Sequence, residues 1–169
     1  MDAVHLHLVL NHFPIIGTLT GVGVLIYGIF INNDHIKKVA MVIFVIMSLL
    51  TIPAYLTGEE AEETIENIAG ISEKLIENHE EFAEIAIIFM GFLAILSIIS
   101  LISLYKKYKF SKIISIITLI VSILTFGFFA QLGNLGGQIR HSEIRKDFNK
   151  NKLNTTTKEF KYEKENDDD

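Results

Sequence analysis

Histidines are the residues of this sequence best suited to chemistry, and they stand at positions 5, 7, 12, 35, 79 and 141. Neutral imidazole is the commonest metal ligand in proteins and a usual axial ligand of haem iron. If the chain lies in a membrane, as its composition indicates below, ionisable side chains at the membrane edge are functional candidates, because their burial without a partner is costly. The pattern predicts a shared metal or cofactor site. The alternative is a set of interfacial histidines, each with one ring nitrogen in water.

Carboxylates supply an alternative set of ligands. Glu59 and Glu63 are four residues apart, which places them on one face of a helix. We include both with the candidate metal ligands, or as acceptors for the second N–H of a ligating imidazole, although solvent-facing glutamates are the alternative. The sequence has no Glu-x-x-His pair, His-Glu-x-x-His motif, catalytic triad, phosphate-binding loop or dinucleotide fingerprint, so no catalytic residue is predicted.

Composition identifies the class of protein that must position these side chains. Of the 169 residues, 50% are hydrophobic, and the mean hydropathy is +0.39. The absence of Cys excludes disulfides, thiolate metal sites, iron–sulfur clusters and covalent c-type haem. A formal net charge of −5 argues against nucleic acid as a partner. Because the apolar residues come in long blocks, the arithmetic predicts a small integral membrane protein in a lipid bilayer.

Four apolar stretches are long enough to cross the hydrocarbon core, which needs roughly 20 helical residues. They cover about 13–31, 39–57, 82–105 and 113–132. Short connections at 32–38 and 106–112 require antiparallel neighbours. We therefore expect an all-α, up-down-up-down four-helix membrane bundle over residues 1–144. The remaining residues, 145–169, are predicted to form a polar, poorly ordered tail.

The charges between the spans predict how the bundle lies in the membrane. The two short connections carry six lysines, whereas the connection at 58–81 carries nine glutamates and one lysine. The positive-inside rule then places the short connections in the cytoplasm and both termini outside, in the periplasm of a bacterial inner membrane. All histidines except His35 fall on the outer face. The long connection is expected to form two short amphipathic helices on the outer surface, 59–68 and 72–81, broken at Gly70 with Ser72 as N-cap.

Glycine and proline mark places where backbone geometry matters. Gly17 and Gly21 form a Gly-x-x-x-Gly pair, which favours close helix packing within the bundle or in a homodimer. A group of glycines after the fourth span, at positions 133, 136 and 137, suggests a bend or close backbone approach at a cofactor edge. Pro14 suits the first turn of a helix, where its missing N–H costs nothing. This proline would fix the geometry beside His12. We rank His12 and His79 first among the candidate ligands.

Four segments together resemble a bacterial family of four-helix membrane proteins catalogued as domain of unknown function 2231. They are His7-Leu-Val-Leu-Asn-His12-Phe-Pro14, Pro53-Ala-Tyr-Leu-Thr57-Gly58, His79 before the third span, and Gly136-Gly137-Gln-Ile-Arg140-His141. The family pattern has a His five residues before a His-Phe-Pro, a Thr-Gly closing the second span, a His before the third, and a Gly-Gly followed by His after the fourth. The match covers about residues 1–144. It singles out His7, His12, His79 and His141, and relatives joined to cytochrome c-like modules imply redox partners.

These observations lead to two functional hypotheses. The first is a small membrane redox module that binds haem b, or else a copper, iron or zinc ion, at the outer face. Its partners would be other redox proteins or a larger membrane complex. The second hypothesis is a non-catalytic accessory or assembly subunit, in which the histidines form a hydrogen-bonding network.

Overall fold

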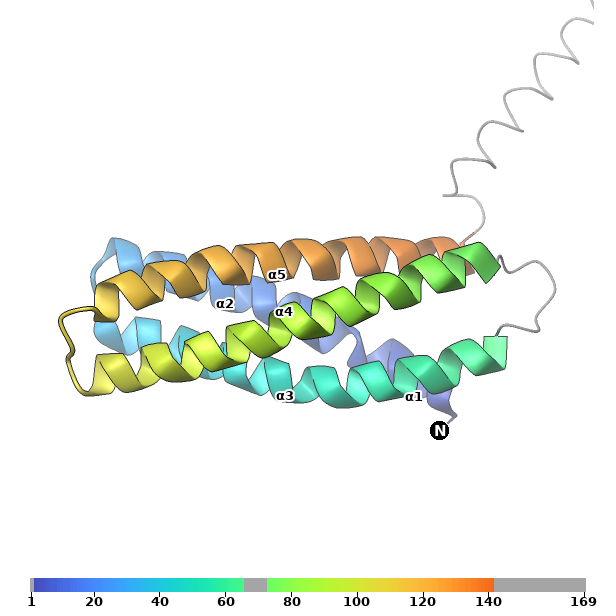
Figure 1. Cartoon of the computed structure of the whole chain (residues 1–169), viewed down its shortest axis with the longest axis horizontal. Coiled ribbons are helices and arrows are strands. Elements are labelled where there is room, and N and C mark those ends of the chain that lie inside the picture. Colours follow the sequence, from blue (N-terminus) through green and yellow to red (C-terminus); the bar gives the residue numbers. More distant parts are fainter. Residues whose placement is uncertain (1, 66–72, 142–169) are drawn as a thin grey trace, which may run out of the picture.

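The computed structural model describes residues 2–65 and 73–141, and they form an all-α four-helix bundle (Figure 1). The helices are α1 (Ala3–Leu10), α2 (His12–Phe30), α3 (Asp34–Ile65), α4 (Glu73–Tyr105) and α5 (Ser111–Arg140). α1 leads into α2 through Asn11, and the two together form the first leg. All four legs are long and apolar enough to cross a membrane. The predicted multi-pass membrane bundle is confirmed, whereas the tail and its boundary lie outside the described residues.

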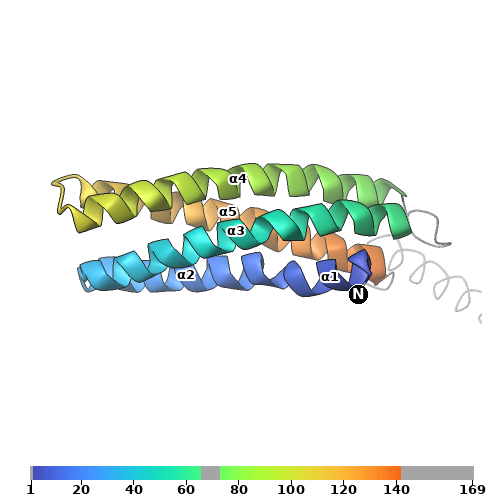
Figure 2. The same ribbon diagram turned by 90° about the horizontal axis from the view of Figure 1, so that it is seen from below.

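Two tight turns make neighbouring legs antiparallel (Figure 2). Asn32 and Lys107 both adopt a left-handed conformation with φ of 52°, one in each turn. The Asn33 side chain then caps α3, because its Oδ1 accepts hydrogen bonds from the backbone N–H groups of His35 and Ile36 at 2.9 and 3.2 Å. These turns reverse the chain within a few residues, as the short connections predict.

Glycines bring α2 close to α3. A Cβ atom on Gly21 would clash with Cε1 of Phe44, and one on Gly17 would clash with the sulfur of Met47. Phe44 is fully buried and belongs to the central apolar cluster. The Gly-x-x-x-Gly pair therefore serves packing within the bundle, one of the two predicted uses.

Small hydroxyl side chains form the seam between α4 and α5. The seam residues are Ser97, Ser100, Ser103, Ser115, Thr118, Ser122 and Thr125, all buried. Most of these hydroxyls donate to a carbonyl three or four residues earlier in their own helix. Ser100 and Ser115 also meet across the seam at 3.3 Å. Small residues of this kind let helix backbones approach closely where hydrophobicity cannot drive association.

The bundle is longer than the hydrocarbon core of a membrane. The 33 residues of α4 span about 50 Å, against about 30 Å of hydrocarbon. Exposed large apolar side chains cover the outer surface of every leg, so these surfaces are suited to contact with lipid. The glutamates of α3 and α4 gather where α3 ends and α4 begins, and we call this the carboxylate end. The opposite end, with both tight turns, is the lysine end.

The expectation of two separate helices on the outer surface is wrong for the described residues. Residues 59–65 continue α3 without a break, and residues 73–81 are the first turns of α4, which runs directly into the third span as expected. Both segments keep a buried side toward the bundle, with Ala61 on α3 and Ile76 on α4. Because this buried side extends the bundle interface, the segments stand along the bundle axis. Gly70 and Ser72 lie outside the described residues.

Candidate functional site

A cavity of about 830 Å³ lies at the carboxylate end and is lined by residues from all five helices. Part of its wall is apolar, built from Ile15, Ala83, Ile87, Phe129 and Leu132. The polar lining contains five histidines, His5, His7, His12, His79 and His141. The bundle therefore brings to one cavity all the histidines that the predicted topology assigned to one face. A volume of this size is typical of sites for small molecules and cofactors.

His7 and His79 form the central pair of the cavity. Their ring centroids are 6.4 Å apart and their planes are inclined at 82°. Nδ1 of His7 lies 2.9 Å from the carbonyl oxygen of Ala54, and Nδ1 of His79 lies 2.9 Å from Oε1 of Glu62. A carbonyl or carboxylate oxygen only accepts hydrogen bonds, so each Nδ1 carries a proton. In the neutral rings, both Nε2 atoms then keep the lone pair that a metal requires.

Two glycines allow the backbone to lie close to these rings. A Cβ atom on Gly58 would lie 3.1 Å from Cε1 of His7, and one on Gly136 would lie 3.4 Å from Nε2 of His79. The close backbone approach expected in the glycine-rich segment of α5 is confirmed at Gly136. Larger residues at these two positions would crowd the two rings.

Asn11 contributes a polar atom with no protein partner. It lines the cavity at the junction between α1 and α2, and its Oδ1 is buried without a hydrogen bond to any described residue. A buried amide oxygen in this condition costs free energy unless a water or a ligand donates to it. Asn11 therefore marks a position in the cavity suited to a hydrogen-bond donor.

The other predicted ligands lie around the central pair. His12 is exposed, and its Nδ1 donates to the carbonyl of Leu8 at 2.8 Å. His141 is also exposed and follows the last residue of α5. His35 lies at the lysine end, as expected. The partner of His79 in the structure is thus His7, although the sequence ranked His12 first.

The glutamate that supports His79 is Glu62, which sequence reasoning did not select. Glu59 lines the cavity and forms a hydrogen bond with Tyr55, whereas Glu63 is exposed and outside the cavity lining. The buried small residues Ala54, Gly58 and Ala61 recur at intervals of three and four. Glu62 stands four residues after Gly58, so this inner face would have pointed to it.

A multi-ligand ion site is not assembled in residues 2–65 and 73–141, where no three His, Asp or Glu side chains are spaced to hold a metal ion. A bare zinc ion takes three or four protein ligands. Haem iron differs because the porphyrin supplies four nitrogens and the protein adds only axial ligands. The His7–His79 pair therefore fits the ligand requirement of haem better than that of a bare ion.

Comparisons with known proteins return no relative. No family model, no curated protein and no solved structure matches the chain. The family resemblance in the sequence therefore stays a prediction, and any functional assignment has to come from the cavity and its residues.

Proposed function

We propose that this protein is a small membrane redox module that binds haem b in the cavity at the carboxylate end. His7 and His79 would be the two protein ligands of the iron. The observation that carries the proposal is their mutual geometry, with each Nδ1 held by an oxygen acceptor and the ring centroids 6.4 Å apart. His7 and His79 would hold the iron through their Nε2 atoms, the ring nitrogens that the oxygen acceptors leave with a lone pair.

The surroundings of the pair support this assignment. Apolar walls at Ile87, Phe129 and Leu132 suit the faces of a porphyrin, and Gly58 and Gly136 leave room beside the two rings. Haem b, when bound, supplies one-electron transfer. Glu62 and the carbonyl of Ala54 would orient the ligands and raise their basicity, as hydrogen-bond acceptors do for metal-bound imidazoles.

The charge of the cavity bears on how a haem would be bound. Asp2, Glu59, Glu62 and Glu80 line it, and the lining contains neither Lys nor Arg. A haem bound here would therefore find no lysine or arginine in the lining to pair with its propionates. A copper, iron or zinc ion on the same two histidines is the other form of this proposal. It would need further ligands from water or from a partner.

The location of the cavity agrees with exchange of electrons at a membrane surface. Under the positive-inside rule the lysine end lies in the cytoplasm, which places the cavity and both termini on the periplasmic side of a bacterial inner membrane. Redox proteins at that surface, or a larger membrane complex, would then be the partners. A homodimer is compatible with this arrangement.

One observation favours the second hypothesis, an accessory or assembly subunit. The hydrogen bond from His7 to Ala54 joins α1 to α3, and the bond from His79 to Glu62 joins α4 to α3. Each histidine therefore connects two helices without any ligand. In this case His7 and His79 would hold the carboxylate end together, and no cofactor would be lost when they are replaced.

An absorption spectrum tests the proposal directly. Protein purified from haem-replete cells should show a Soret band, and His7→Ala and His79→Ala should each remove it. His12→Ala is the matched control within the cavity, and His35→Ala is the control at the lysine end. Both controls should keep the haem of the wild type.

Folding of the variants must be separated from ligand loss. Helical content and elution volume in detergent report the fold, and added imidazole should restore the band to His79→Ala if only the ligand is missing. A colourless wild type with no bound metal, together with His7 and His79 variants that only lose stability, would overturn the redox proposal in favour of the accessory subunit.

A further inference from the structure

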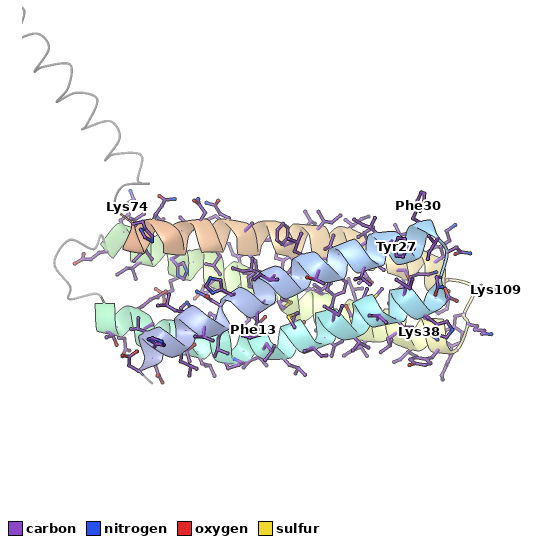
Figure 3. The ribbon with its side chains drawn as sticks, turned by 180° about the vertical axis from the view of Figure 1, so that it is seen from behind. Phe13, Tyr27, Phe30, Lys38, Lys74 and Lys109 are labelled. Carbon is purple, nitrogen blue, oxygen red and sulfur yellow. The ribbon has the colours of Figure 1, made fainter. Side chains whose placement is uncertain are left out.

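Lysines gather at the end of the bundle opposite the cavity. Figure 3 shows Lys38 and Lys109 there, whereas Lys74 lies at the carboxylate end. The two connections at this end carry six lysines, Lys37, Lys38, Lys106, Lys107, Lys109 and Lys112, and their single carboxylate is Asp34. This distribution makes the lysine end strongly positive.

Only part of this charge is neutralised within the protein. Lys37 is 3% exposed, and its Nζ lies 2.7 Å from Oδ1 of Asp34. The Nζ of Lys38 lies 4.1 Å from the centre of the Tyr105 ring, a cation–π contact that keeps its charge. The other four lysines are exposed and form no ion pair with any described residue. Their charge is available to an external anion.

The backbone of the second turn fixes where these lysines stand. The N–H of Lys106 donates to Ile102, that of Tyr108 to Ser103 and that of Ser111 to Tyr108, all within 3.0 Å. Lys107 takes the left-handed position that closes the turn. These three bonds hold the lysine side chains on a compact turn.

Aromatic and apolar side chains border the lysines on the side of the membrane. Tyr105 is 67% exposed, and the rings of Tyr108 and Phe110 stack with centroids 5.1 Å apart. On α2, Phe30 is 87% exposed at the same end (Figure 3). Tyrosine rings are enriched at the level of lipid headgroups. Exposed isoleucines follow at once, with Ile102 on α4 and Ile113 on α5.

We propose that this end carries a binding site for anionic phospholipids, formed by Lys38, Lys106, Lys107, Lys109 and Lys112. The ammonium groups bind the phosphate of the headgroup, the tyrosines lie at the headgroup level, and the acyl chains lie along the exposed isoleucines of α4 and α5. An anionic lipid meets both the lysines and the bordering apolar surface, whereas a soluble acidic partner would meet the lysines alone, which is why a lipid fits better. The proposal is independent of what the cavity binds.

Lipid retention by the purified protein tests the site. The protein in mild detergent is mixed with phosphatidylglycerol or phosphatidylcholine, and bound lipids are counted by native mass spectrometry. Each lysine near an anionic lipid contributes about a fivefold gain in affinity. Lys109→Gln should therefore weaken phosphatidylglycerol binding about fivefold, and Lys106→Gln, Lys107→Gln, Lys109→Gln and Lys112→Gln combined should abolish the preference over phosphatidylcholine.

Lys74→Gln is the matched control, because it removes one lysine from the carboxylate end and should change nothing. The melting temperature in phosphatidylcholine should be the same for all variants, since the four lysines are exposed. Equal binding of the two lipids by the wild type, or an unchanged preference in the fourfold variant, would overturn the proposal. Complete displacement of phosphatidylglycerol by inorganic phosphate would also overturn it and indicate a site for a free anion.

Discussion

Replacing Glu62 by alanine should weaken cofactor binding without touching either proposed ligand. The carboxylate accepts the Nδ1–H of His79 at 2.9 Å, and His79 is only 9% exposed. The variant therefore leaves a buried N–H unpaired and removes the bond that fixes the ring. Leaving such a donor unsatisfied costs about 1–3 kcal/mol. Loss of a partner behind a metal-bound histidine typically lowers metal affinity ~10–100-fold. At about 1.4 kcal/mol per factor of ten, the two magnitudes agree.

A second substitution separates the hydrogen bond from the charge. Gln at position 62 keeps an acceptor oxygen but makes a neutral hydrogen bond, which is weaker by about 1 kcal/mol. Glu62→Gln should therefore cost about fivefold in affinity, less than Glu62→Ala.

The measurement is a titration of haem-free protein with haem, followed by the Soret band. Glu63→Ala is the matched control, because it removes the same charge one residue later from an exposed position outside the cavity lining. If Glu63→Ala weakens binding as much as Glu62→Ala, the effect is general electrostatics and the reasoning from the hydrogen bond fails. Wild-type affinity in Glu62→Ala would refute it as well.

Three further predictions concern packing around the site and along the bundle. Gly58→Ala should lower haem affinity about fivefold or more, because the added Cβ would lie 3.1 Å from Cε1 of His7 and overpacking costs about 1–3 kcal/mol. The same titration measures it, and unchanged affinity would contradict the crowding argument. Gly21→Ala should lower the free energy of unfolding by about 1–3 kcal/mol through its clash with Phe44. The control Gly91→Ala, whose Cβ would meet nothing within 4 Å, should be neutral or stabilising by up to about 1 kcal/mol. Equal shifts of the two variants in thermal unfolding in detergent would exclude this explanation. Ser100→Leu should overpack the seam between α4 and α5 and lower the free energy of unfolding by about 1–3 kcal/mol. Ser100→Ala should change this free energy little. Similar melting temperatures for the two variants would speak against close packing of the two helices.

The fold could be predicted because the membrane imposes strong rules on sequence. Apolar segments of about 20 residues between charged connections determine the four spans, and the short connections determine that neighbours are antiparallel. What composition did not predict is how far the helices continue beyond the apolar segments. Glutamates at positions 59–65 look like a surface connection, yet Gly58 and Ala61 on the same turns keep an inner face against the bundle. The helices keep packing against each other there, although the apolar segments of the sequence have already ended.

The candidate site could be predicted only in part. The sequence brought five histidines to one end, but the choice between His7 and His12 depends on the helix phase. Pro14 has no N–H for the carbonyl of Leu10, and the helix is interrupted at Asn11 between α1 and α2. Asn11 itself keeps a right-handed helical backbone, with φ of −63° and ψ of −23°, so His7 and His12 stay about 140° apart around the helix axis. Only His7 meets Ala54 and His79, while His12 remains exposed. The sequence predicts that these two histidines point to different sides of the helix, but which side faces the bundle depends on packing against the neighbouring helices.

The two ends of the bundle are chemically opposite, so the orientation of the chain decides which face each proposal concerns. The sequence has no Cys, which makes single cysteines clean reporters of accessibility. Glu60→Cys reports the carboxylate end and Lys109→Cys the lysine end, and both positions are exposed. An impermeant maleimide added to intact cells should label Glu60→Cys, and should label Lys109→Cys only after the membrane is opened, because lysine-rich connections stay in the cytoplasm. The reverse labelling would move the cavity to the cytoplasmic surface and the lysine end to the outer leaflet. The proposed redox partners would then have to be cytoplasmic, while the His7–His79 geometry and the lipid-binding argument would keep their basis in the structure.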